Sequence, residues 1–234
     1  ANDFGTYKKV VGILMEPQPK PNISSIASGF GAGKGTAFAS INYSDFDLQT
    51  KDDGDNDGSI AIGMGFGDPS TTFGSELVLG ITSVSTKYWG DGSFGDEGNF
   101  SFKIHKVIEP LFGEDYASMA LGISNVIGWG GTKEMPSNGF VVYSGASSLG
   151  QFSEYGLLYS MGYGSAVGNG ESESDLFGGL ALARYQVSSS LSFIGPEAYL
   201  SFTYYPQFMD LSLSYTRADI LDNFGQKRNI LTLN

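Results

Sequence analysis

Residues 60–66 read Ile60-Ala61-Ile62-Gly63-Met64-Gly65-Phe66. Large apolar side chains alternate here with Ala and Gly. Because successive side chains of a β-strand point to opposite faces, this period of two predicts a strand with one apolar face and one nearly bare face. The same period recurs along the chain, most sharply over 100–105, where the sequence is Phe-Ser-Phe-Lys-Ile-His. The pattern therefore predicts an all-β protein.

Ten strands follow from this alternation, and two weaker candidates lie near the ends of the chain. The ten are expected near 36–45, 58–67, 72–84, 98–107, 116–127, 139–146, 153–164, 176–187, 197–205 and 210–218, and the weaker two at 7–15 and 228–233. Most reach about 9–11 residues, the length that a tilted strand needs to cross a bilayer. After residue 187 the alternation blurs, because 188–190 (Ser-Ser-Ser) and 194–197 (Ile-Gly-Pro-Glu) both resemble turns. The sequence thus predicts ten or twelve strands.

The composition excludes several classes of protein. The chain has 34 Gly among 234 residues, 14% aromatic residues and only 16% charged residues. Disordered chains show the reverse, with high charge and few aromatics. Helical bundles are disfavoured, because Gly costs about 1 kcal/mol relative to Ala at a helix-interior position. The net charge of −12 has the wrong sign for a nucleic-acid binder, and the absence of Cys excludes disulfides and thiolate metal sites.

The residues opposite the apolar faces favour a closed barrel over a β-sandwich. A sandwich exposes that second face to water, so it should carry Lys, Glu and Thr, whereas here it carries mainly Gly, Ser and Ala. Such small residues suit the interior of a narrow barrel. The chain has no run of about 20 apolar residues for a transmembrane helix, so a membrane would be crossed by strands. A secreted or cell-surface β-sandwich, acting as a binding module or assembly subunit, is the alternative.

Long and short connections alternate along the predicted strands. Long polar loops are expected at 46–57, 85–97, 128–138 and 165–175, and shorter links at 68–71, 108–115 and 147–152. In its alternation, loop pattern and Gly, Tyr and Phe content, the chain resembles the Gram-negative outer-membrane β-barrel class over about 36–218. The resemblance implies an antiparallel up-and-down transmembrane barrel in the outer membrane, in contact with its lipid, with acidic extracellular loops and short periplasmic turns.

The two ends of the chain bear on this resemblance. The sequence opens with 1–4 (Ala-Asn-Asp-Phe), without an initiator Met or an apolar segment, as expected if a signal peptide has been removed. It ends with 230–234 (Ile-Leu-Thr-Leu-Asn), whereas barrels of this class usually end in a strand with a terminal aromatic residue. The last residues therefore depart from the class.

The chain divides into an N-terminal extension, residues 1–34, and a single barrel domain, residues 35–234. Within the extension, 16–21 (Glu-Pro-Gln-Pro-Lys-Pro) either links a first short strand to the barrel or threads into the lumen. Residues 31–36 (Gly-Ala-Gly-Lys-Gly-Thr) look like a phosphate-binding loop, but the pattern needs Gly at Ser28 and Ser or Thr at Gly35, followed by a helix. We interpret them as a flexible glycine-rich entry to the barrel.

Four ionisable residues are predicted on the inner faces of strands: Glu76, Lys103, His105 and Arg184. A cation facing lipid at mid-membrane costs about 2–4 kcal/mol, so we expect these side chains to face the lumen. There they would pair as structural plugs or line a narrow path. His105 is the only His, so His-dependent catalysis would need it. Its expected place near the short-turn end is not where the resemblance puts the catalytic groups of barrel enzymes. We therefore predict no enzymatic activity, with a hydrolase through His105 as the third interpretation.

An acidic loop suggests a cation site. Asp53, Asp55 and Asp57 match the first half of a calcium-binding loop, in which alternate carboxylates converge on a hard cation. The twelfth position should be Glu and is Met64, which excludes an EF-hand. The loop is then either a weak, exposed Ca²⁺ site or a solvated acidic hairpin, and no other cofactor is expected. The predicted function is a narrow, weakly cation-preferring channel for small solutes or ions, or a non-catalytic structural barrel.

Overall fold

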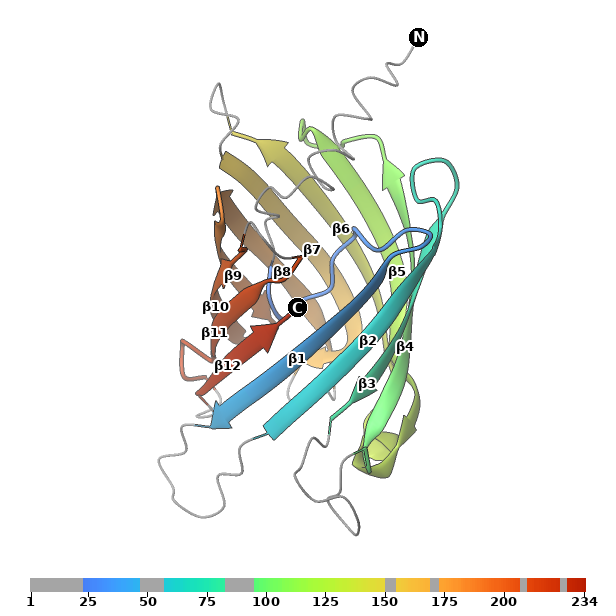
Figure 1. The fold of residues 1–234 in the computed structure, drawn as a ribbon, viewed down its shortest axis with the longest axis vertical. Helices are drawn as coiled ribbons and strands as arrows, with labels where there is room; N and C mark the ends of the chain where they lie inside the picture. Colours follow the sequence, from blue (N-terminus) through green and yellow to red (C-terminus); the bar gives the residue numbers. More distant parts are fainter. Residues whose placement is uncertain are drawn as a thin grey trace.

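The computed structural model describes residues 23–46, 57–82, 95–149, 155–168, 173–206, 210–223 and 227–234. Twelve strands in these ranges form one closed antiparallel barrel (Figure 1). The strands are β1 (Ala37–Phe46), β2 (Asp57–Gly67), β3 (Gly74–Ile81), β4 (Gly98–Ile108), β5 (Tyr116–Trp129), β6 (Asn138–Ser148), β7 (Tyr155–Gly168), β8 (Glu173–Arg184), β9 (Val187–Ile194), β10 (Glu197–Tyr204), β11 (Leu213–Ala218) and β12 (Arg228–Leu233). A short 3-10 helix, η1 (Gly130–Glu134), follows β5.

Each strand pairs with its neighbours in sequence, and the first strand pairs with the last. β1 contacts β12 in a register that runs from Ile41 opposite Leu233 to Phe46 opposite Arg228. On its other side β1 pairs with β2, so no strand is left at an edge. This confirms the prediction of an all-β antiparallel up-and-down barrel and decides its strand number as twelve. The β-sandwich alternative is wrong, because a sandwich consists of two separate sheets.

The sequence prediction missed one strand, β9. Residues 188–190 were expected to form a turn, but they lie inside β9, and the chain reverses at 185–186 instead. Ser188, Ser190 and Ser192 are buried and face the lumen, while Leu191 on the other parity is exposed. A lumen-facing row of serines resembles a turn in sequence, because Ser is also common in turns. The predicted turn at 194–197 is confirmed between β9 and β10, 228–233 forms β12, and the candidate strand at 7–15 lies outside the described residues.

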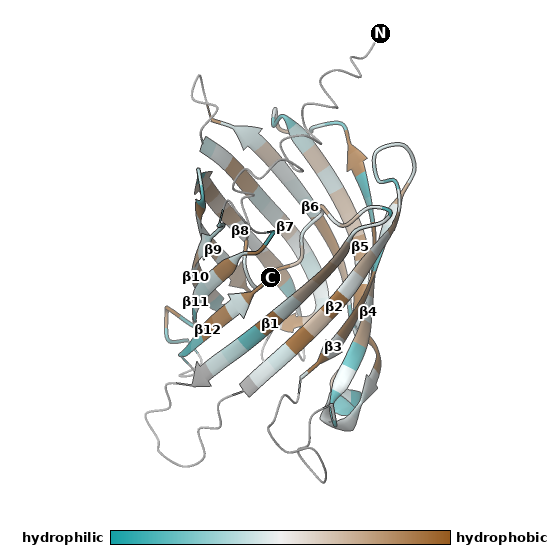
Figure 2. Ribbon diagram, in the orientation of Figure 1, coloured by the Kyte–Doolittle hydropathy of each residue, from teal (hydrophilic) through white to brown (hydrophobic). Residues whose placement is uncertain are grey.

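The outer surface of the barrel is apolar. Ile62 on β2 is 51% exposed and Leu191 on β9, on another part of the ring, is 53% exposed. Hydrophobic segments recur along strands all round the barrel (Figure 2). Soluble monomers rarely expose apolar patches larger than a few hundred Å². This surface therefore indicates a membrane location. The other exposed apolar and aromatic side chains of this outer surface include Met64, Phe66, Leu77, Phe102, Ile104, Leu121, Met161, Tyr163, Leu180, Leu182, Phe193, Phe202, Tyr215 and Leu231.

Cross-strand pairs explain why Gly and aromatic residues are both abundant. Gly122 lies directly opposite Phe140, whose ring covers it so closely that a Cβ on the glycine would lie 2.2 Å from Cζ of the ring. Gly63 is covered in the same way by Phe38. Rings lying over cross-strand glycines are a known device for holding the register of a curved sheet. The same arrangement pairs Gly98 with Trp129, Gly145 with Tyr159, Gly162 with Phe177 and Gly178 with Phe193.

The two ends of the barrel differ in their connections. We call the end that carries the connections 47–56 and 82–97 the long-loop end, and the end that carries 68–73 and 109–115 the short-turn end. The predicted asymmetry holds for these strands but fails later, because residues 195–196 alone join β9 to β10 at the long-loop end. The predicted loop at 165–175 is also shorter, since β7 extends to Gly168 and β8 starts at Glu173.

Candidate functional site

The interior of the barrel is occupied by the chain that precedes β1. We call residues 23–36 the lumen segment; it lies inside the ring of strands before it enters β1 (Figure 1). Ile23 is 6% exposed and packs with Leu158 and Ala181 of the barrel wall. Ile26 packs against the buried cluster of Ala120, Val142 and Phe177. Threading into the lumen was one of two alternatives for 16–21, which lies outside the described residues. The structure shows it for the segment that follows.

Hydroxyl groups of the wall hold the first part of the lumen segment. Ser24 Oγ lies 2.7 Å from Ser201 Oγ, and the Oγ of Ser192 donates to the Ser24 carbonyl oxygen at 2.8 Å. These wall residues belong to a row of buried Ser and Thr side chains on β9, β10 and β11, in which Ser201 Oγ also lies 2.7 Å from Thr216 Oγ1. The small polar face predicted for the strands therefore binds a backbone inside the barrel.

Gly29 lies in close contact with the wall. Its N–H donates to Ser144 Oγ at 2.8 Å, and its carbonyl oxygen accepts from Ser118 Oγ at 2.6 Å. A Cβ on Gly29 would lie 2.3 Å from the Ser118 carbonyl oxygen, a contact that real Cβ atoms do not make. Only glycine fits at this position, so the segment passes between β5 and β6 side chains without room for a larger residue.

An ion pair between β3 and β4 binds the backbone of the lumen segment at residues 28–32. Lys103 Nζ lies 2.7 Å from Glu76 Oε2, and it also donates to the carbonyl oxygens of Phe30 at 2.9 Å and Ser28 at 3.4 Å. Glu76 in turn accepts a hydrogen bond from the Ala32 backbone N–H. A buried charge is tolerable only when paired and hydrogen-bonded, and here the partners are the opposite charge and the lumen segment. The strand parity thus predicted correctly that Glu76 and Lys103 face the lumen.

His105 also contacts the segment. Its side chain is among the most buried of the described residues, at 2% exposed, on β4 at the short-turn end of the barrel. The ring lies so close to Gly31 and Gly74 that a Cβ on either glycine would come within 2.7 Å of it. Both glycines are therefore required by the volume of the imidazole. Residues 31–36, predicted as a flexible glycine-rich entry, are in part packed against the wall.

The predicted inward position of Arg184 is wrong. It is the last residue of β8, is exposed, and shares the strand parity of the outward-facing Leu180 and Leu182. Its guanidinium lies 4.7 Å from the ring centre of Tyr155 and 5.0 Å from that of Tyr185. At a strand end the cost of a cation next to lipid falls to about 0–1 kcal/mol, and aromatic rings stabilise it further. The cost of about 2–4 kcal/mol that favours an inward cation applies only at mid-membrane.

The predicted calcium loop is not tested by the structure. Asp53 and Asp55 lie outside the described residues, and Asp57 is placed only as the first residue of β2, opposite Ser44. Within the ranges that the structure covers, no group of three or more His, Asp or Glu side chains is arranged to hold a metal ion.

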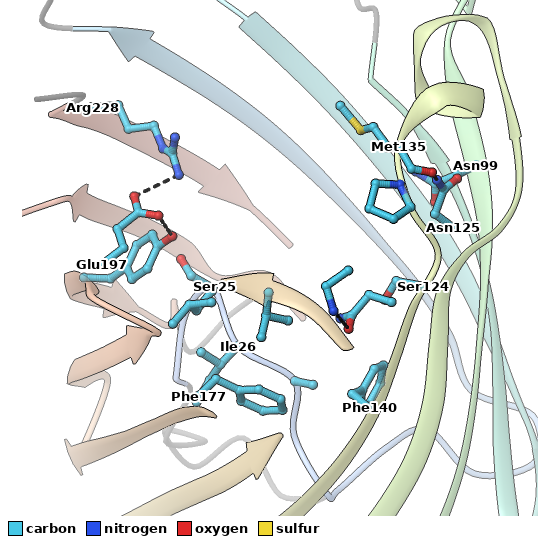
Figure 3. A pocket seen from close by; sticks show the side chains of 17 residues that line it. Ser25, Ile26, Asn99, Ser124, Asn125, Met135, Phe140, Phe177, Glu197 and Arg228 are labelled. Carbon is cyan, nitrogen blue, oxygen red and sulfur yellow. Dashed lines mark hydrogen bonds and ion pairs between the residues drawn. The ribbon is translucent and has the colours of Figure 1, made fainter. Parts of the chain in front are cut away.

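A cavity of about 540 Å³ lies on the other side of the lumen segment, toward the long-loop end. Figure 3 shows its lining, with Ile26, Phe140 and Phe177 together and Arg228 and Glu197 at the opposite side from Asn99 and Asn125. Arg228 Nη2 lies 3.0 Å from Glu197 Oε1. The sequence analysis missed this pair, although Arg228 opens the predicted strand 228–233 and shares its parity with Thr232, which would have placed it inside.

The geometry defines a closed twelve-stranded barrel with an apolar exterior and a lumen that the chain's own segment occupies in part, with a cavity beside it. Comparisons with protein-family models, with curated proteins and with solved structures find no match to this chain. In the described part of the chain, no helix has the length and apolar character to cross a membrane.

Proposed function

We propose that this protein is an outer-membrane barrel of a Gram-negative bacterium that is closed at rest by its lumen segment and opens as a narrow channel for small solutes or ions when the segment moves. The observation that carries the proposal is how the segment is held. Its contacts are largely hydroxyl groups, backbone groups and one ion pair. Such hydrogen bonds exchange for water at a net cost of about 0.5–1.5 kcal/mol each, so the segment can be released and bound again.

A permanent structural barrel is the second candidate. It is favoured by the apolar contacts of Ile23 and Ile26 with the wall, which are lost when the segment leaves. We propose packing rather than catalysis as the role of His105, because the imidazole is buried between Gly74 of β3 and Gly31 of the lumen segment. A hydrolytic activity that disappears in His105→Ala would contradict this.

The membrane location predicts a position-dependent effect of an added cation. Leu180→Arg should cost about 2–4 kcal/mol, because it puts the charge against lipid in the middle of β8. Leu221→Arg is the matched control: Leu221 is 64% exposed, against 51% for Leu180, but it lies outside the strands. The measurement is the fraction of protein that migrates as the folded band on an unheated gel after refolding into lipid vesicles. Equal yields for the two variants, or a native protein that stays soluble without detergent, would rule out the membrane assignment.

The charge predicts the selectivity. With a formal net charge of −12, the protein should concentrate cations near its mouth. Openings in a planar bilayer under a KCl gradient should therefore reverse at a potential of the sign expected for K⁺, and the preference should weaken at high salt because of screening. A reversal potential of the sign expected for Cl⁻ would contradict this part of the proposal.

A further inference from the structure

We infer that the cavity between the lumen segment and the long-loop end binds an uncharged, ring-bearing solute with hydroxyl groups, of the size of an aryl glycoside. The inference deepens the proposed function, on which it rests for the passage of the bound solute through the barrel. A volume of about 540 Å³ lies in the range of small-molecule sites in proteins.

One side of the cavity is apolar and aromatic. Phe140 and Phe177 meet edge to face, with ring centres 6.5 Å apart and ring planes at 76°. Ile26 of the lumen segment and Ile194 of β9 pack, like Phe140, against the buried cluster that contains Phe177. Figure 3 shows Ile26 and the two phenylalanines close together. An apolar, aromatic wall of this kind can pack against the apolar face of an aromatic or sugar ring.

Another side carries neutral polar side chains. Asn99, Ser124 and Asn138 line the cavity there, and Ser25 of the lumen segment adds a hydroxyl on the side of Glu197 (Figure 3). Asn138 accepts a hydrogen bond from the Ala166 N–H through Oδ1 at 3.1 Å, which leaves its amide N–H groups to donate. Amides and hydroxyls both donate and accept, so they match the hydroxyl groups of a solute, which also do both.

The charged side chains of the cavity are matched to each other rather than to a ligand. Among the described lining residues, Arg228 is the one cation and Glu197 the one anion, and they form an ion pair at 3.0 Å. The second carboxylate oxygen of Glu197 accepts from the Tyr199 hydroxyl at 2.5 Å. An anionic ligand would meet Arg228 already paired and Glu197 beside it. A charged ligand would therefore be desolvated beside an ion pair of zero net charge, and the site favours a neutral molecule.

Two probes that differ by a single group test this. 4-Nitrophenyl β-D-glucopyranoside is neutral, and 4-nitrophenyl β-D-glucuronide carries a carboxylate in place of its CH₂OH group. Equilibrium dialysis against the detergent-solubilised full chain, followed by absorbance, measures both. We expect the glucoside to bind about tenfold or more tightly than the glucuronide, the factor expected for an unpaired charge. Equal or tighter binding of the glucuronide, or no binding of the glucoside, would overturn the inference.

Two variants locate the binding. Ser124→Phe adds a ring to the cavity from β5 and should weaken glucoside binding about tenfold or more, because the ring occupies the space of the ligand. Ser40→Phe adds the same ring to β1, away from the cavity lining, and should leave binding unchanged. Both variants must first give the folded band of the unheated gel. Binding that is unaffected by Ser124→Phe would place the glucoside elsewhere and overturn the inference.

The failure of this inference and the failure of the channel proposal give different results. If a variant that displaces the lumen segment conducts, but the native protein binds no glucoside, the binding site is ruled out and the channel proposal stands. If Ser124→Phe weakens glucoside binding but the protein never conducts, the binding site stands and the proposal that the lumen segment opens a channel is ruled out.

Discussion

Gly29→Ala should open the barrel. The added Cβ would lie 2.3 Å from the Ser118 carbonyl oxygen and 3.0 Å from the Ser144 backbone nitrogen. Both atoms belong to β5 and β6, which pair continuously in this region, so the wall cannot yield and the lumen segment must move. This movement breaks the hydrogen bonds of Gly29 to Ser144 and Ser118. At about 1 kcal/mol each, their loss shifts the balance between closed and open states about 30-fold, which planar-bilayer recording measures as open probability.

Gly33→Ala is the matched control for this experiment. It makes the same substitution in the same segment, but its Cβ would lie 3.6 Å from Cδ of Pro69, an ordinary van der Waals contact. We expect its open probability to equal that of the native protein. A Gly29→Ala variant that stays closed while remaining folded, or an equal rise in both variants, would show that the lumen segment does not close the channel.

Lys103→Met should be the most destabilising change in the lumen. The variant leaves Glu76 buried, with its side chain 10% exposed, and removes the donor to the carbonyl oxygens of Phe30 and Ser28. Breaking a buried ion pair by removing one partner costs about 3–5 kcal/mol, because the other charge stays uncompensated. Equilibrium unfolding in urea, with the protein in lipid vesicles, measures this loss.

The double variant separates the charge from the packing. In Glu76→Gln with Lys103→Met no charge is left, while the glutamine can still accept from the Ala32 N–H. We expect it to be more stable than Lys103→Met alone, since neutral replacements of buried ion pairs are often tolerated. If the losses of unfolding free energy from the two substitutions simply add, the interaction between Glu76 and Lys103 contributes nothing to stability. The lumen segment is then held by its other contacts.

Local alternation was enough to predict most of the barrel wall. Along the middle of β2 and β4 the outward positions are apolar and most inward ones are small or polar, so each strand and its orientation follow from its own residues. The exception on the outer face of β4 is Lys106 near the strand end, whose Nζ lies over the Phe73 ring. Alternation does not reveal a strand whose inward face has the composition of a turn, as in 188–190 of β9. It also failed at Arg184, where a cation at a strand end is stabilised by two tyrosine rings outside the barrel.

Part of the site could be predicted for the same local reason. Glu76 and Lys103 lie opposite each other in the register of β3 and β4, and their parity alone puts both inside. Glu197 and Arg228 could not be paired in this way, because β11 lies between their strands. Their contact depends on the curvature of the closed barrel, which carries side chains of non-adjacent strands toward each other.

The sequence by itself determined that this chain forms strands with one apolar and one small-residue face, which favours a barrel over a sandwich. The choice between the two was decided by the closed ring of strands. Strand period is a local property, readable from neighbouring residues. The tertiary structure alone decided which residues of the wall hold the lumen segment and where a cavity is left beside it. Ser24 meets Ser192 and Ser201, and Gly29 meets Ser118 and Ser144, through contacts between residues far apart in the sequence. No pattern along the chain encodes such contacts, because they exist only once the ring has closed around the segment.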